Sequence, residues 1–244
     1  MRIETLSLRL RHRPPVQAAE LGISLCREHL GEVWRSFAVV ALPVTTVALA
    51  TSEIAGWLPF VILFLIQPWL DRTILFVLSR AAFGQTTTPG DLWRARRMVW
   101  WRHLWLSLSI RRLSPWRAIT EPVYLLEGLP VNAARRRAVQ VRRRQVGAGL
   151  MVMHTFAVAE LCLTVALLSF VFWFAPQGTG PDVADFLLDG RAGWTSSAMF
   201  VAYAVSVFFI EPFHVAAGFA LYLNRRTELE AWDIEQEFRR AFAA

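Results

Sequence analysis

The sequence predicts an all-α fold: a polytopic helical membrane protein with four transmembrane helices, an interfacial helix and cytoplasmic amphipathic helices. Two observations predict it. Hydrophobic residues make up 55% of the 244 residues, which is more than one soluble core of this size needs. In addition, the segments 34–51, 58–80, 150–174 and 195–223 are apolar over about the 20 residues that a helix needs to cross a bilayer.

The N-terminal residues lack the apolar core and small-residue cleavage site of a secretory signal, so we expect them to be retained. The predicted parts, in order, are a charged cytoplasmic leader and juxtamembrane helix (1–33), a first transmembrane hairpin (34–80), an Arg-rich cytoplasmic and interfacial region (81–149), a second transmembrane hairpin (150–223) with a short periplasmic loop (175–193), and an acidic cytoplasmic tail helix (224–244).

Arginine predicts which side of the membrane each loop faces. All 26 basic residues are arginine, and most lie in the leader, in 94–144 or after the last span. By contrast, the turn at 51–56 contains none, and 175–193 contains only Arg191. Short Arg-rich segments stay in the cytoplasm, so both termini are expected there. Three residues are expected at the periplasmic interface, where amphipathic rings settle: Trp57, Trp173 and Trp194.

The Arg-rich region contains a helix start in TTTPGDLW. Thr88 is placed to cap the helix, Pro89 lies in its first turn, and Asp91 reaches back to the cap. The helix is expected to run to Leu108 with tryptophans between its arginines, which suits a helix lying on the inner leaflet. A re-entrant segment at 98–110 is the alternative.

A polybasic stretch precedes the third span, and we expect 133–149 to continue straight into that span as one helix. Arginines beside a membrane gain about 1 kcal/mol each near anionic lipid, so we expect anionic headgroups as the ligand and no nucleic acid. The stretch forms a cytoplasmic basic face, which consists of Arg135, Arg136, Arg137, Arg142, Arg143 and Arg144.

Four ionisable residues fall at a similar depth in the spans: Asp71, Arg72, Glu160 and Glu211. Because unpaired charges are costly at that depth, they are expected to turn inward and meet. Arg72 is then the only cation against three carboxylates, so at least one carboxylate should be protonated or bound to something else. The cluster could fix helix packing, carry protons or ions, or hold a lipid headgroup or a small ligand.

The second and fourth spans share the pattern I-[QE]-P-aromatic, in IQPW and IEPF. Pro68 and Pro212 each remove an intrahelical hydrogen bond, so both are predicted to kink their helices. Duplication of a helical hairpin would produce this similarity, and coincidence is the alternative.

Four stretches resemble a family of uncharacterised multi-pass inner-membrane proteins of proteobacteria: AAELGISLCREHLGEVW, DRTILFVLSRAAFG, RRLSPWRAITEPVYLLEGL and EPFHVAAGFALYLNRRTELEAWDIEQEFRR. The arrangement is also similar, more distantly, to the membrane domain of some glycerophosphodiester phosphodiesterases. The resemblance implies a polytopic helical fold in a bacterial inner membrane. It implies no phosphodiesterase activity, because the catalytic part of those proteins is a separate domain.

The sequence lacks the motifs of the common catalytic sites: HExxH, GxSxG, a Walker lysine and CxxC. We therefore expect a protein that is not an enzyme and needs no cofactor. Glu28, His29 and Glu32 could share one helical turn, but a solvated helix face is expected there and no metal site. Cys26 and Cys162 fall at different depths, so no disulfide is expected.

Two functional hypotheses follow. The first is a non-catalytic scaffold or assembly subunit of a membrane complex, with a membrane-protein partner or a second copy of the chain. The alternative is a transporter or channel component that uses the buried charges. The acidic tail helix is either solvated, docked on the Arg-rich 94–144 region, or bound to a partner protein.

Overall fold

The computed structural model describes residues 13–102, 114–174 and 193–230, and all regular elements in these ranges are helices. Four of them are long and apolar enough to cross a membrane, so the prediction of a helical membrane protein with four spans is confirmed. Parts of four predicted segments lie outside the described residues: 1–12 of the leader, 103–110 of the 98–110 segment, 175–192 of the periplasmic loop and 231–244 of the acidic tail.

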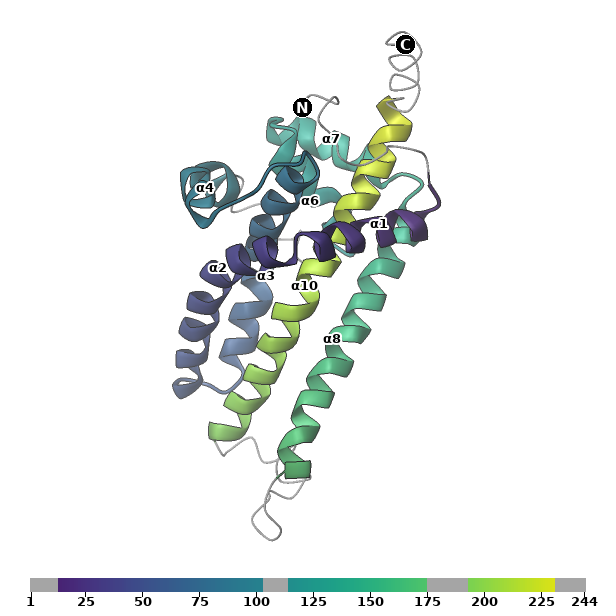
Figure 1. Ribbon diagram of the computed structural model, residues 1–244. Coiled ribbons are helices and arrows are strands. Elements are labelled where there is room, and N and C mark those ends of the chain that lie inside the picture. Colours follow the sequence, from purple (N-terminus) through teal and green to yellow (C-terminus); the bar gives the residue numbers. More distant parts are fainter. Residues whose placement is uncertain (1–12, 103–113, 175–192, 231–244) are drawn as a thin grey trace.

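The four spans are α2 (Leu30–Ala50), α3 (Leu58–Ala81), α8 (Val146–Phe174) and α10 (Gly193–Glu230). They run alternately up and down, with α10 beside each of the other three (Figure 1). Helix α10 continues past the predicted end at 223, to Glu230. Helix α8 packs mainly against α10 and has the least buried surface of the four.

Aromatic pairs and a glycine fix the packing around α10. Phe37 of α2 stacks on Phe208 with ring centroids 5.5 Å apart, and Phe60 of α3 meets Phe200 edge-on at 5.5 Å. Nearer the other end, Gly218 lies so close to a neighbouring helix that a Cβ there would be 2.3 Å from Cβ of Ala118. The small residues Gly218 and Ala118 thus allow the backbones of α10 and α6 to approach closely.

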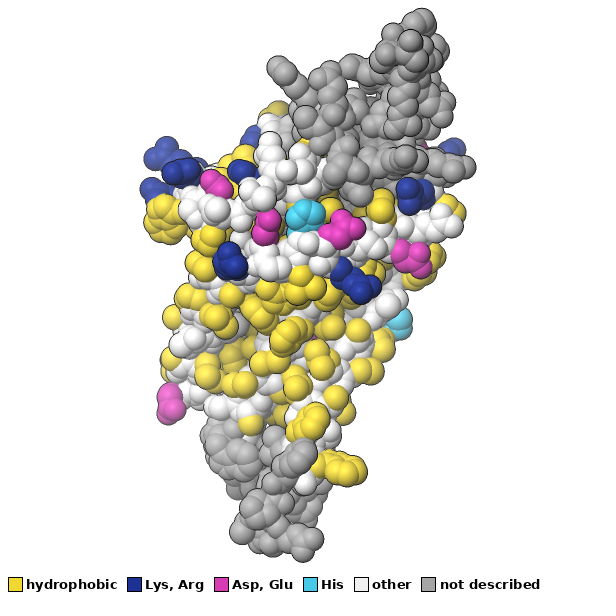
Figure 2. All heavy atoms as spheres, in the orientation of Figure 1, with side chains coloured by type: hydrophobic (Ala, Val, Ile, Leu, Met, Phe, Trp, Pro, Cys, Tyr) yellow, Lys and Arg dark blue, Asp and Glu magenta, His cyan; other side chains and the backbone are white. Residues whose placement is uncertain are grey.

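Apart from the short 3₁₀ turn η2 (Thr51–Glu53) between α2 and α3, the remaining described helices gather at one end of the bundle, which we call the charged end. They are α1 (Pro15–Glu28), α4 (Pro89–Arg94), the π-helical turn η3 (Arg97–Trp101), α6 (Arg117–Leu126) and α7 (Val131–Arg142). In Figure 2 the charged side chains gather there, and the middle of the bundle shows a broad apolar surface. Trp57 and Trp173 are exposed at the opposite end, and the side chain of Trp194 is not described.

Helix α1 lies across α10 and packs against it (Figure 1). Gly22 makes this crossing possible, because a Cβ there would lie 2.2 Å from the carbonyl oxygen of Ala216. Just before α1, the backbone N–H of Arg13 donates to Asn224 Oδ1 at 3.0 Å, and Asn224 Nδ2 donates back to the Arg13 carbonyl at 2.9 Å. The start of α1 is therefore fixed to α10.

The predicted helix start at Thr88 is confirmed, but the helix is shorter than predicted. Thr88 and Asp91 form a capping box, and the hydrogen bonds from the Thr88 backbone and side chain lower the pKa of the Asp91 carboxyl. Helix α4 nevertheless ends at Arg94 and is followed by the turn η3. Arg72 contacts this turn, because its Nη1 donates hydrogen bonds to the carbonyls of Val99 and Arg102.

The prediction of one continuous helix over 133–149 is wrong. Helix α7 ends at Arg142 and α8 begins at Val146. Between them Arg144 has a φ of 66°, a left-handed conformation that a continuing helix excludes. The break lets Trp116 pack at the start of α8, where its Nε1 donates to the Val146 carbonyl at 3.1 Å.

Candidate functional site

A buried arginine from α6 joins two of the spans. Helix α6 begins at Arg117, and its Nη2 donates to Oε1 of Glu211 in α10 at 2.9 Å. The same Nη2 lies 3.1 Å from Oδ2 of Asp71 in α3. We call these three residues the Arg117 clamp. All three side chains are buried, so the clamp fixes the distances between α3, α6 and α10.

Two further groups hold the Glu211 carboxylate. Gln67 of α3 donates from Nε2 to Oε2, and Nδ1 of His214 lies 3.1 Å from Oε1. Glu211 is therefore held by side chains of α3, α6 and α10. Charge-assisted hydrogen bonds of this kind are what allows a carboxylate to stay buried.

A second buried ion pair lies nearer the charged end. Nε of Arg72 in α3 donates to Oε1 of Glu121 in α6 at 2.8 Å. On the next residue of α3, Thr73 Oγ1 accepts a hydrogen bond from Trp100 Nε1 at 3.1 Å. Residues 72 and 73 thus attach both α6 and η3 to the second span.

The structure brings Asp71 and Glu211 together as predicted, but it corrects the role of Arg72. Arg72 is not the only cation of the layer, because Arg117 supplies the positive charge for both of these carboxylates. Sequence reasoning missed Arg117 and Glu121, since α6 is too short to count as a span. Glu160 lies in the neighbouring α8 and is half-buried.

A dipeptide that occurs three times in the sequence, Gln-Pro or Glu-Pro, could have predicted that Glu121 belongs to the buried network. A Gln or Glu directly precedes each of Pro68, Pro122 and Pro212, and all three prolines lie inside helices. The three polar side chains all belong to the buried network: Gln67, Glu121 and Glu211. Helices α3 and α10 continue through Pro68 and Pro212, and the kink at each stays a prediction, as does duplication of a hairpin.

A cavity of about 460 Å³ lies beside the clamp, between α3, α8 and α10 and the start of α6. Polar groups line it: Gln67, Arg117, Glu160, Thr164, Glu211 and His214. We call it the polar cavity. Burial by itself would lower the pKa of the Arg117 guanidinium, but the charges of the surrounding carboxylates, Glu160 among them, raise it. Glu160 lines the same cavity as Arg117 and Glu211 of the clamp.

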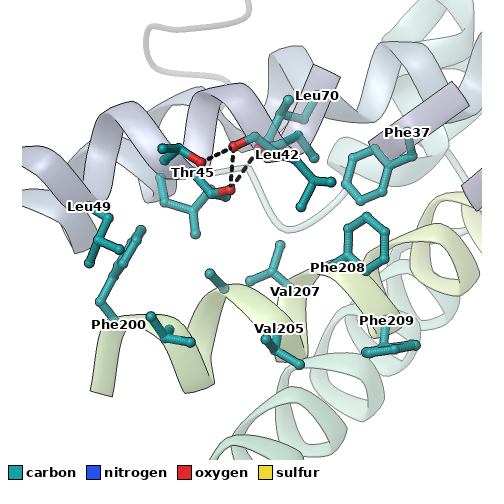
Figure 3. A pocket seen from close by; sticks show the side chains of 15 residues that line it. Phe37, Leu42, Thr45, Leu49, Leu70, Phe200, Val205, Val207, Phe208 and Phe209 are labelled. Atoms are coloured by element: carbon teal, nitrogen blue, oxygen red, sulfur yellow. Dashed lines mark hydrogen bonds between the residues drawn. The ribbon is translucent and has the colours of Figure 1, made fainter. Parts of the chain in front are cut away.

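A second hollow, of about 270 Å³, lies between α2, α3 and α10 and is apolar (Figure 3). Phe37, Leu70, Phe200 and Phe208 point into it from three helices. The Thr45 hydroxyl is satisfied locally, because it donates to the Ala41 carbonyl at 2.9 Å. This hollow offers van der Waals contacts only, so recognition chemistry belongs to the polar cavity.

The predicted basic face divides into two sets. Arg137 is paired with Glu127 and with Glu230 at the end of α10, and Arg142 lies over the Trp116 ring, 4.6 Å from its centroid. The other members are exposed: Arg135, Arg136, Arg143 and Arg144. The contact between Arg137 and Glu230 agrees with the docking of acidic tail residues on the Arg-rich region.

No protein-family model, curated protein or solved structure matches this chain. Within the described ranges, no three His, Cys, Asp or Glu side chains are grouped as a metal site would require. Cys26 is buried in α1, which raises the pKa of its thiol to about 12, and Cys162 is exposed on α8. The absence of a metal or cofactor therefore stays a prediction.

Proposed function

We propose that this chain is a non-catalytic scaffold or assembly subunit of a membrane complex in a bacterial inner membrane, with its charged end in the cytoplasm. The Arg117 clamp carries the proposal. Its buried ion pairs, from Arg117 to Asp71 and to Glu211, join α6 to α3 and α10. Breaking such a pair costs several kcal/mol, so the helices at the charged end are held on the spans as a fixed platform.

The platform presents charge to the cytoplasm. Arg135, Arg136, Arg143 and Arg144 are exposed on it, while Arg137 is used internally. The high arginine content of this end and the Arg-free turn at 51–56 support a cytoplasmic orientation. Exposed arginines suit anionic headgroups and an acidic surface on a membrane-protein partner.

Co-purification tests the scaffold function. The tagged full chain, extracted in a mild detergent, should recover a stable partner in stoichiometric amount. Arg135→Glu with Arg136→Glu should reduce that recovery at least several-fold, because it reverses the charge of the exposed face. Glu53→Gln, an exposed change at the opposite end, is the matched control and should recover the partner fully. A chain that purifies alone from its native membrane would contradict the scaffold function.

The polar cavity favours a second candidate, a transporter or channel component. Charged groups around a cavity between spans are typical of transport sites. Purified protein in liposomes, with no partner present, should then carry a proton or ion flux that Glu160→Gln abolishes. Absence of flux together with a stable partner would favour the scaffold.

A further inference from the structure

The polar cavity contains a hydrogen-bond donor that needs an acceptor. Nη2 of Arg117 is used by Asp71 and Glu211, but Nη1 of the same guanidinium is buried and has no hydrogen-bond partner within the described parts of the chain. Arg117 lines the cavity, and a buried N–H without a partner is costly. A ligand in the cavity should therefore carry an acceptor for this N–H.

The acceptor should be uncharged. The positive charge of Arg117 is already shared between two carboxylates, since Nη2 lies 3.1 Å from Oδ2 of Asp71 and 2.9 Å from Oε1 of Glu211. A phosphate or a fatty-acid carboxylate would add a third anion to this buried site, where like charges repel strongly. A carbonyl or hydroxyl oxygen accepts a hydrogen bond without adding a charge.

His214 offers a second polar contact for a ligand. Its side chain lines the cavity, and its Nδ1 lies 3.1 Å from Oε1 of Glu211, so Nε2 is the ring nitrogen that remains for a ligand. Nε2 accepts a hydrogen bond when the imidazole is neutral and donates one when it is protonated. It can therefore contact either a hydroxyl or a carbonyl group.

The cavity lies inside the apolar core of the bilayer. Helix α1 packs across α10 at Ala216, and from Ala216 to Thr195 α10 is about 31 Å long, close to the roughly 30 Å core of a bilayer. His214 lies within this length, and its ring is 5.6 Å from that of Phe156 in α8. From Phe156 the wall of the cavity continues to Thr164, about 12 Å farther from the charged end. Charged headgroups are costly at this depth, whereas an uncharged ring compound is soluble there.

Apolar and aromatic side chains form the rest of the cavity and its mouth. Phe64, Phe156 and Tyr203 contribute rings. At the mouth, Phe64 of α3 and Met153 and Leu161 of α8 are 41, 42 and 62% exposed. Cavities of roughly 300–1,000 Å³ with aromatic walls and a few polar groups typically hold small molecules, and this one measures about 460 Å³. A ligand that enters between α3 and α8 comes from the bilayer.

We propose that the polar cavity binds the ring of a lipid-soluble quinone. One ring oxygen accepts a hydrogen bond from Nη1 of Arg117. The other contacts Nε2 of His214, as a carbonyl in the quinone and as a hydroxyl in the quinol. The ring lies among the aromatic side chains, and the isoprenoid tail leaves past Leu161 into the bilayer. A quinone thus combines an uncharged acceptor with a flat ring and solubility in the apolar core.

Equilibrium binding to the delipidated full chain in a mild detergent tests the site. Three probes that share a decyl chain are added singly: decylubiquinone, decylbenzene, which lacks the ring oxygens, and undecanoate, which is an anion. Decylubiquinone should bind about tenfold more tightly than either other probe, the factor expected for one hydrogen bond to a charged group. Native mass spectrometry should show one decylubiquinone for each chain.

Two alanines of α8 provide a matched pair of variants. Both are exposed, but Ala157 lines the cavity and Ala166 does not. Ala157→Phe should fill the cavity and abolish the binding of decylubiquinone, whereas Ala166→Phe should leave it unchanged. Arg117→Lys keeps a cation beside the two carboxylates but removes Nη1, so it should reduce the binding of decylubiquinone to the level of decylbenzene. Circular dichroism shows whether each variant is folded.

Four results would overturn the proposal. The absence of bound decylubiquinone would mean that water alone fills the cavity, and tighter binding of undecanoate would mean that the acceptor is an anion. Equal binding of decylubiquinone and decylbenzene would show that the ring oxygens are not recognised. Unchanged binding in Ala157→Phe would place the ligand elsewhere. The measurement needs no partner protein and no flux, so failure here is distinguishable from failure of the scaffold function.

Discussion

Arg72 in the second span donates to Glu121 in α6 at 2.8 Å, and both side chains are buried. This contact shows how an Asp-Arg pair is tolerated in an apolar helix. Helix α6 of the charged end provides an oppositely charged partner for each of the two residues: Glu121 pairs with Arg72, and Arg117 pairs with Asp71. The two residues would otherwise each face an apolar environment.

Replacing Arg72 by Leu should destabilise the protein by about 3–5 kcal/mol, because it leaves the Glu121 carboxylate buried beside an apolar side chain. Adding Glu121→Leu should restore much of the loss, since an apolar pair often replaces a buried ion pair at little cost. The unfolding temperature in a mild detergent measures both effects. Better rescue by Glu160→Gln than by Glu121→Leu would mean that the assigned pairing is incorrect.

Arg117→Leu should lower stability further than any single change at the exposed arginines, because two carboxylates lose their shared cation. Full rescue should require Asp71→Asn together with Glu211→Gln, and each alone should restore only part. The amount of folded protein in isolated membranes measures this. Arg135→Leu, at an exposed position, is the control and should change stability by no more than about 0.5 kcal/mol.

Gly218→Ala should destabilise the packing of α6 on α10 by about 1–3 kcal/mol, because the new methyl group would overlap Ala118, including its backbone. Gly147→Ala is a matched control in α8, where nothing lies within 4 Å of the added Cβ. That control should be neutral or stabilising by up to about 1 kcal/mol. The unfolding temperatures of the two variants, measured under the same conditions, test this prediction. Equal stabilities would argue against the close α6–α10 contact.

Arg137 and Glu230 should show a coupling of about 0.5–1 kcal/mol in a double-mutant cycle with Gln at each position, because both side chains are only partly exposed. The coupling should fall at high salt, which screens partly solvated charges. Unfolding in detergent at low and high salt measures it. A cycle between Arg135 and Glu230 serves as the control, and coupling of the same size there would show that the effect is only long-range.

Reporter fusions should place the loops on two sides of the membrane. Fusions after Gly56 and within 178–190 should report the periplasm, and fusions after Gly84, Gly128 and Ala244 should report the cytoplasm, because arginine is concentrated at the charged end. Alkaline phosphatase and fluorescent-protein activities measure this pattern. A periplasmic signal at Gly128 would contradict four spans with both termini in the cytoplasm.

The sequence by itself determined the features that depend on composition and local chemistry. Apolar segments of sufficient length predict the four spans, because a backbone in lipid must satisfy its own hydrogen bonds. The Thr88 cap also follows from neighbouring residues alone. Buried charges at Asp71 and Glu211 were enough to predict that α3 and α10 turn these faces inward, since unpaired charge is costly in an apolar environment.

Only the tertiary structure decided which charges pair. Arg117 is 46 positions from Asp71 and 94 from Glu211, and Arg72 is 49 from Glu121, so local pattern carries no information on these contacts. The same holds for the break at Arg144, beside which Trp116 donates to the Val146 carbonyl at the start of α8. Ion pairing depends on distances in three dimensions, and Gly218 contributes to them by letting α6 approach α10 closely.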